Sequence, residues 1–430
     1  MHISQNCWSG FRLSTKTGEQ QYIKASGKYF ALSLAGGGGP VAVCSLDRPG
    51  RFEPGASQTL GGHSGGVLDF DWNPFDDSML ATASEDCTIK IWSIPEDWEP
   101  IDANGNAKKG ESMGPSDALA VLEGHRKKVT LVRYHPTASN VLASTSADLT
   151  VRVWDCERGE CVSKCEAFND LLHDVVWDEC GDNLASSCKD KALRIIDPRT
   201  GTVSSTVESI HEGSKSVKLQ YVEDSTHILS TGFNKTSARE MKLWDIRNLS
   251  SPVNTQKIDS ASGAFVPLYD NDTKVVYLCG KGDGKLGYFE VEAPKVHALS
   301  EFRSTSPGKG YCDVPKRALN VMKCETARIL KVTSGGVEPL SFTVPRKSDA
   351  FQDDIFPDTA GLEPAHTCEE WLAGSSKKPI TVSLDPKKKA GNKGSKTKIM
   401  SVASLKKELA TAEERIKYLE GKLSEANIEF

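Results

Sequence analysis

The chain has 430 residues, of which 38 % are hydrophobic and 26 % charged, and a formal net charge of −5 at pH 7. No run approaches the roughly 18 apolar residues of a membrane-spanning helix, and the N-terminal stretch lacks the apolar core of a secretory signal. We therefore expect a soluble cytoplasmic protein. Its twelve cysteines show no metal-ligand spacing, so we expect reduced thiols and neither a metal nor a cofactor.

The first 61 residues contain two strand-like pieces, 29–34 and 41–43, joined by a run of four glycines and a proline. Such a run can form a phosphate-binding loop. No GK[ST] motif and no helix start follows it, so a hairpin turn is favoured. The basic residues Arg12 and Lys16 precede these strands.

Two copies of one unit follow, and both show the same landmarks at the same spacing. His and Asp are 23 residues apart, and Asp and Trp are 6 apart. The landmarks are His63, Asp86 and Trp92 in the first copy and His125, Asp148 and Trp154 in the second. Short alternating runs lie between them, as in a four-stranded antiparallel sheet, with the Asp in the turn before the third strand. This repeat is typical of a WD-repeat propeller blade.

A serine two residues before each Asp, Ser84 and Ser146, completes a set of His, Asp, Ser and Trp. The set resembles a nucleophilic triad. An enzyme needs only one such site, so a set repeated in successive blades indicates a structural hydrogen-bond network. We predict this WD network and no catalytic activity.

Three more blades can be counted along the chain. The third has Phe168 in place of the His but keeps Trp177 and Asp190, the fourth runs from His211 to Trp244, and the fifth spans 265–289. A closed ring plausibly takes seven, so we assign 300–344 and the N-terminal strands to the remainder. A first strand that completes the last blade would remove the open sheet edge. The prediction is an all-β, seven-bladed WD-repeat β-propeller over residues 1–345.

Residues 346–373 are predicted to be a C-terminal extension packed on the propeller. Its Asp353 and Asp354 could ligate a metal, but no further ligand stands at a suitable spacing, so a polar strap is favoured. Residues 374–398 contain eight lysines and one aspartate and predict a flexible linker. Weak contact of this linker with an anionic membrane is an alternative to simple solvation.

The last segment, 399–430, shows a heptad pattern that predicts a short α-helical coiled coil. Arg415 and Glu420 occupy flanking positions at which parallel chains can pair, which favours a parallel assembly. Alanines in the seam leave an antiparallel tetramer open, and a lone helix packed back on the propeller is a further alternative. The predicted oligomerisation residues are Val402, Leu405, Leu409, Arg415, Ile416, Leu419, Glu420 and Leu423.

Several stretches of the chain closely resemble the coronin family of actin-binding WD-repeat proteins. The resemblance rests on 84–88, 188–191, 259–263, 280–283, the Pro-Arg-Lys-Ser-Asp run at 345–349 and the Pro-Asp-Thr-Ala-Gly run at 357–361. It implies a seven-bladed propeller with an extension, a linker and a coiled coil, in the actin cytoskeleton and the cell cortex. It further implies binding and bundling of filamentous actin, and contact with the Arp nucleating complex and cofilin.

The resemblance also implies roles for single residues. The filament-binding residues that it implies are Arg12 and Lys16 near the start, Lys281 and Asp283, and Arg346. Residues 415–420 look like the family's trimerisation motif, which implies a parallel homotrimer. A rival hypothesis is a scaffold or adaptor for trafficking or signalling proteins, with actin binding incidental. No feature of the sequence indicates nucleic-acid binding.

Overall fold

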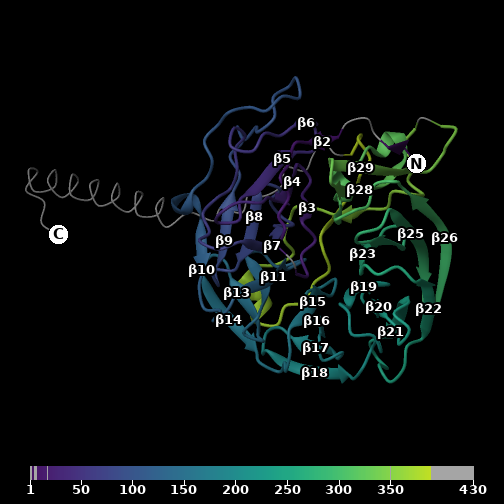
Figure 1. Cartoon of the computed structure of the whole chain (residues 1–430). Helices are drawn as coiled ribbons and strands as arrows, with labels where there is room; N and C mark the ends of the chain where they lie inside the picture. Colours follow the sequence, from purple (N-terminus) through teal and green to yellow (C-terminus); the bar gives the residue numbers. More distant parts are fainter. Residues whose placement is uncertain (1, 4–6, 17, 349, 389–430) are drawn as a thin grey trace, which may run out of the picture.

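The structure is a computed structural model, and it describes residues 2–3, 7–16, 18–348 and 350–388. Seven sheets, antiparallel except for the short pair of β2 and β6, are arranged as blades around a central axis (Figure 1). The predicted all-β, seven-bladed propeller is therefore confirmed. Among the described residues, no helix has the length and apolar character needed to span a bilayer.

Each of five blades is a four-stranded meander. Along the chain their strands are β7 (Val67–Trp72), β8 (Met79–Ser84), β9 (Ile89–Ser93), β10 (Ala120–Leu122); β11 (Val129–Tyr134), β12 (Val141–Ser146), β13 (Val151–Asp155), β14 (Glu160–Cys165); β15 (Leu172–Trp177), β16 (Leu184–Cys188), β17 (Leu193–Asp197), β18 (Thr202–Val207); β19 (Lys218–Val222), β20 (His227–Phe233), β21 (Arg239–Asp245), β22 (Asn254–Asp259); and β23 (Phe265–Asp270), β24 (Val275–Gly280), β25 (Lys285–Glu292), β26 (Lys295–Arg303).

The remaining two blades are built from the ends of the propeller sequence. One contains β3 (Ile23–Ala25), β4 (Tyr29–Ser33) and β5 (Val41–Ser45). The other combines β27 (Gly310–Asp313), β28 (Glu325–Thr333) and β29 (Gly336–Thr343) with three short N-terminal strands, β1 (His2–Ile3), β2 (Trp8–Ser9) and β6 (Gly50–Arg51). Strand β2 pairs with β29, with Trp8 opposite Val337. The predicted closure of the last blade by a first strand is confirmed.

The innermost strands β3, β7, β11, β15, β19, β23 and β27 contact one another in that order, and β27 contacts β3. Apolar side chains are buried mainly between neighbouring blades, as in the cluster of Phe30, Leu32, Leu330 and Val332 that joins the first and last blades. The hydrophobic core is thus divided among the blade interfaces, which is how a chain of this length folds without one large core.

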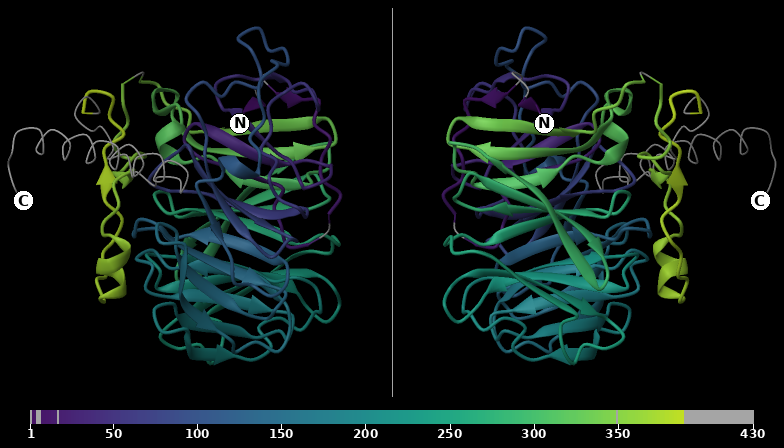
Figure 2. Two further views of the ribbon diagram at one scale, coloured as in Figure 1. Left: turned by 90° about the vertical axis from the view of Figure 1, so that its left-hand side faces the viewer. Right: turned by 90° about the vertical axis from the view of Figure 1, so that its right-hand side faces the viewer.

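The propeller has two opposite faces (Figure 2). One face, called the extension face, carries the loops that join each innermost strand to the second, such as 73–78, 135–140 and 178–183, and it is covered by the C-terminal segment. The other face, called the open face, carries the loops that join second to third strands, such as 34–40, 85–88 and 281–284. Short 3-10 helices η1 (Pro115–Asp117), η2 (Lys316–Ala318) and η3 (Val321–Lys323) lie between strands.

The predicted extension is present and longer than predicted. It contains helix α1 (Cys368–Leu372) and a two-stranded antiparallel sheet of β30 (Thr359–Ala360) and β31 (Thr381–Val382), between which α1 lies in the sequence. Beyond β31, Leu384 is fully buried against Val321 and Phe356. The predicted start of a flexible linker at residue 374 was therefore wrong, because 374–388 pair with and pack on the rest of the fold. Residues 389–430, which include the predicted coiled coil, lie outside the described residues.

Candidate functional site

The predicted WD network is assembled in both copies of the repeat. In the first, His63 Nδ1 lies 2.8 Å from Asp86 Oδ2, and His63 Nε2 lies 2.8 Å from Thr82 Oγ1, which also accepts from Trp92 Nε1 at 2.8 Å. The carboxylate can only accept and the indole N–H can only donate. Nδ1 therefore donates to the carboxylate. Burial lowers the pKa of His63, which favours the neutral ring, in which Nε2 accepts from the Thr82 hydroxyl.

The hydroxyl in this network is two residues earlier than predicted. In the second copy, Ser144 Oγ takes the same place, 2.8 Å from both His125 Nε2 and Trp154 Nε1. Ser84 and Ser146 instead accept the main-chain N–H of the Asp two residues later, at 3.2 and 3.0 Å. Strand residues two apart face the same side, so alternation alone did not distinguish the two positions.

A third copy of the network was missed by sequence reasoning. His211 lies 2.8 Å from Glu240 and 2.9 Å from Ser230, which accepts from Trp244 at 2.9 Å. A glutamate replaces the aspartate, and the hydroxyl-to-Trp separation is 14 residues in place of 10. The signal that could have found it is the spacing of 19 residues from His to hydroxyl, which all three copies share.

The blade without a His uses a different pair at the same place. Arg194 forms a short ion pair with Asp190, at 2.6 Å, and lies over the ring of Phe168 at 5.4 Å. The landmarks therefore hold the turns of each sheet. They do not converge on a single reactive centre, and within the described residues no group of three or more His, Cys, Asp or Glu could hold a metal.

The extension is anchored by Trp371, which is fully buried. Its indole N–H donates to the main-chain oxygen of Gly181 at 3.1 Å, and the same oxygen lies 3.0 Å from His135 Nε2. The rings of His135 and Trp371 meet edge to face at 4.9 Å, and Arg199 lies 4.8 Å from the indole ring. Gly181 has φ +76°, and a Cβ there would lie 2.0 Å from the His135 ring, so only glycine fits.

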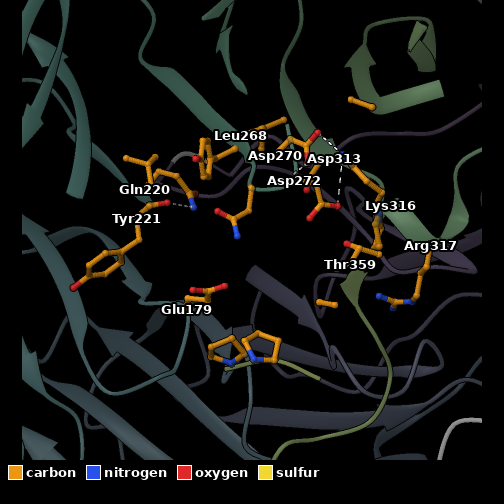
Figure 3. A pocket seen from close by; sticks show the side chains of 18 of the residues that line it. Glu179, Gln220, Tyr221, Leu268, Asp270, Asp272, Asp313, Lys316, Arg317 and Thr359 are labelled. Carbon is orange, nitrogen blue, oxygen red and sulfur yellow. Dashed lines mark hydrogen bonds and ion pairs between the residues drawn. The ribbon is translucent and has the colours of Figure 1, made fainter. Parts of the chain in front are cut away.

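A cavity of about 610 Å³ lies between the extension and the propeller axis (Figure 3). Its carboxylates largely serve to hold neighbouring segments. Lys316 pairs with Asp270 at 2.5 Å, and Lys378 of the extension lies 3.4 Å from both Glu179 and Asp224. The acidic rim of the extension face thus binds Lys378, a lysine that the sequence had placed in a linker.

Of the predicted filament-binding residues, Arg12 and Lys16 are exposed on the open face. The main-chain oxygen of Arg12 accepts from Ala35 at 2.7 Å, next to the glycine-rich hairpin turn. Lys16 forms an ion pair with Glu85 at 2.7 Å. Both side chains are therefore available to a partner that approaches this face.

Lys281 and Asp283 are on the same side of the propeller but face inward. Lys281 Nζ donates to the main-chain oxygen of Gln20 at 2.5 Å, and burial together with nearby Lys218 lowers its pKa to about 8. Asp283 pairs with the buried Arg239 at 2.8 Å. Both residues bind other parts of the chain, and their resemblance to filament-binding residues does not place them on an exposed surface.

Arg346 is separated from the other four. It follows β29 at the extension face and pairs with Asp354 at 2.5 Å. Arg12 and Lys16 therefore lie beside the open-face residues Ala35 and Glu85, and Arg346 follows the end of β29 at the opposite face. The predicted oligomerisation residues all lie outside the described residues.

Three protein-family models match four parts of the chain. A WD domain, G-beta repeat, matches 56–93 and 116–155, and a further type of WD40 repeat matches 337–379. A domain of unknown function, DUF1899, matches 3–51.

Human Coronin-2A is 38 % identical over 392 residues, which cover 89 % of this chain and 72 % of that protein. The chain belongs to the coronin family. The coronin-like protein crn1 of Schizosaccharomyces pombe is 39 % identical over 377 residues, covering 87 % of this chain and 61 % of that protein. The predicted family is thus confirmed, and with it an actin-regulating protein.

Comparison with solved structures supports the same family and fold. The WD40 domain of Toxoplasma gondii coronin superposes with a TM-score of 0.83 at 34 % identity, covering 90 % of this coronin and 97 % of that chain. A chain of the mitotic checkpoint complex superposes with a TM-score of 0.58 at 14 % identity, which shows a shared fold only.

Proposed function

We propose that this coronin binds filamentous actin through the open face of its propeller and cross-links filaments as an oligomer. The observation that carries the proposal is membership of the coronin family combined with exposed bases, Arg12 and Lys16, on a face that the extension leaves uncovered. Actin filaments are acidic, so binding of this kind is electrostatic and weakens as salt screens the charges.

Cross-linking requires more than one propeller in an assembly. The heptads of 399–430 supply a coiled coil, for which a parallel trimer is the proposed form. Joining propellers raises the effective concentration of each for a second filament, so weak single contacts become bundling. The proposed location is the actin cytoskeleton and the cell cortex, with the Arp nucleating complex and cofilin as further partners.

The test compares three full-length proteins with actin filaments. Leu409→Asp with Ile416→Asp places charges in the proposed seam, and Thr411→Asp, on the outer side of the same helix, is the control. We expect the seam variant to sediment with filaments at high speed but to lose low-speed bundling, while the control retains both. Bundling by the seam variant equal to wild type would contradict the proposed route. Absence of filament binding by all three would favour the adaptor hypothesis.

A further inference from the structure

Basic side chains gather on the open face at two neighbouring blades, β7–β10 and β11–β14. We call this group the basic patch. Arg126, Lys127 and Lys128, immediately before β11, are all exposed and form its centre. Its remaining members are Lys16, Arg152 and Lys164.

The members surround two carboxylates. The hydrogen bond from Lys16 and the positive charge of nearby Lys128 hold the pKa of Glu85 below its usual range. Likewise the hydrogen bond from Lys164, with the charges of Arg126 and Arg152, lowers the pKa of Glu166. The ionised Asp86 and Asp148 lie in the same turns, next to Glu85 and at 2.9 Å from the Arg126 N–H. The six cationic groups therefore exceed these four acids by two.

The WD network fixes the backbone of the patch. The Arg126 N–H donates to Asp148 at 2.9 Å, the Lys127 oxygen accepts from Ser146 Oγ at 2.9 Å, and the Lys128 oxygen accepts from Ala147 at 3.0 Å. Within the described chain, no ion pair engages the three side chains themselves. Their backbone is ordered before a partner arrives, so binding would cost little main-chain entropy.

Lys309 is also exposed beside loop 281–284 and has no ion pair among the described residues, but it stands singly, and four other lysines of the open face have internal partners. Lys189 lies 3.9 Å from Asp170, and Lys235 lies 3.1 Å from Glu212. Lys191 and Lys215 donate to main-chain oxygens at 2.7 and 2.9 Å. The basic patch therefore stands out by the number of cations that lack an internal partner.

We infer that the basic patch is the surface on which an acidic protein docks. The inference rests on the proposed function, since charge complementarity makes the acidic surface of the filament the occupant. It assigns the main contact to Arg126, Lys127 and Lys128, which the family resemblance did not indicate, with Lys16 at the edge. In this arrangement Lys281 does not contact the partner. It supports binding indirectly, because it holds the N-terminal segment that carries Lys16.

The test uses the full chain with all three central residues reversed, Arg126→Glu, Lys127→Glu and Lys128→Glu. The matched control reverses Lys109, Lys295 and Lys323, which are also exposed and without an ion pair among the described residues, and changes the net charge equally. Melting temperatures verify that both fold. Binding is measured to actin filaments, to poly-L-glutamate and to phosphatidylserine vesicles, at low ionic strength.

We expect the patch variant to bind filaments at least about tenfold more weakly than wild type, a loss of about 1.4 kcal/mol or more, with the control within about twofold. Equal filament binding by the patch variant overturns the inference and leaves the proposed function standing. If wild type binds no filaments, the proposed function fails. In that case, binding of poly-L-glutamate that the patch variant loses would still support the inference that an acidic protein docks on the basic patch. No binding of poly-L-glutamate would overturn the inference. Binding to vesicles that the patch variant loses, without binding to either polypeptide, would also overturn the inference.

Discussion

The Lys281 ammonium donates to the main-chain oxygen of Gln20 at 2.5 Å. Next to it, Lys218 pairs with Glu19 at 2.7 Å, and Glu19 also accepts from Ser216 at 2.5 Å. These contacts hold the N-terminal segment 18–22 against two distant blades. Lys281 is therefore part of the internal support of the open face.

The first prediction follows from this support. Lys281→Glu places a carboxylate against the Gln20 carbonyl and close to Glu19, so segment 18–22 should detach, while Lys281→Met loses only the hydrogen bond. We expect faster hydrogen exchange over 18–25 in both variants, with the larger change in Lys281→Glu. Weakened filament binding with unchanged exchange would show instead that Lys281 contacts the filament directly.

The second prediction concerns the hydroxyl of the WD network. Thr82→Val leaves the indole N–H of Trp92 and His63 Nε2 buried without partners, at a cost of about 2–4 kcal/mol in unfolding free energy. Ser84→Ala removes one weaker contact and should cost about 1 kcal/mol. Urea unfolding measures both. A larger loss for Ser84→Ala would restore the network predicted from the sequence.

The WD network also shows which features of a blade can be predicted from the sequence and which cannot. The spacing of His, Asp and Trp predicts blades, because each landmark is set by local turns and strand lengths. It does not identify Thr82, because Thr82 and Ser84 share a face of β8. Nor does it find Glu240, because a longer turn displaces it from the expected position.

The other differences between the sequence-based predictions and the structure arise from contacts between residues that are distant in the sequence. The lysines at 377 and 378 predict a linker by composition, but Lys378 pairs with Glu179 and Asp224 from two separate blades. Lys281 follows a family motif in the sequence, and only the path of residues 18–22 across the open face turns it inward. Long-range contacts of this kind leave no periodic signal.

The third prediction concerns the anchor of the extension. Trp371→Ala removes a fully buried indole, its hydrogen bond to Gly181 and its contact with Arg199, and should destabilise docking of the extension by about 3–5 kcal/mol. Tryptic cleavage after Lys377 should accelerate, whereas the Lys378–Pro379 bond resists trypsin in any case. The half-buried neighbour Leu372 provides the control, and Leu372→Ala should change cleavage much less. Equal cleavage rates would mean that β31 and Leu384 hold the extension without the indole.

The fourth prediction is a pH dependence at His135. Burial, together with nearby His366 and Arg199, lowers its pKa to about 3, although the hydrogen bond to Gly181 acts in the opposite direction. In the neutral ring Nδ1 accepts from the N–H groups of Thr137 and Ala138, and Nε2 donates to the Gly181 oxygen. Unfolded His135 binds a proton near pH 6.5, so its contribution is complete above that pH and is lost as the pH falls toward 3.

Between pH 6.5 and 3 this single group should reduce the unfolding free energy by up to about 1.4 kcal/mol per pH unit. Other buried histidines titrate in the same direction, so the readout is the difference between wild type and His135→Gln. The variant should be less stable at pH 7 and show a shallower loss on acidification. If the unfolding free energies of wild type and His135→Gln fell equally with decreasing pH, His135 would not be the group responsible.

The claim that this coronin is an electrostatic actin-filament binder is tested most directly by co-sedimentation of the full chain with filaments across a range of salt concentrations. The account predicts saturable binding that weakens steadily as salt increases. Binding that is unaffected by salt, or no binding even at the lowest salt, would contradict it.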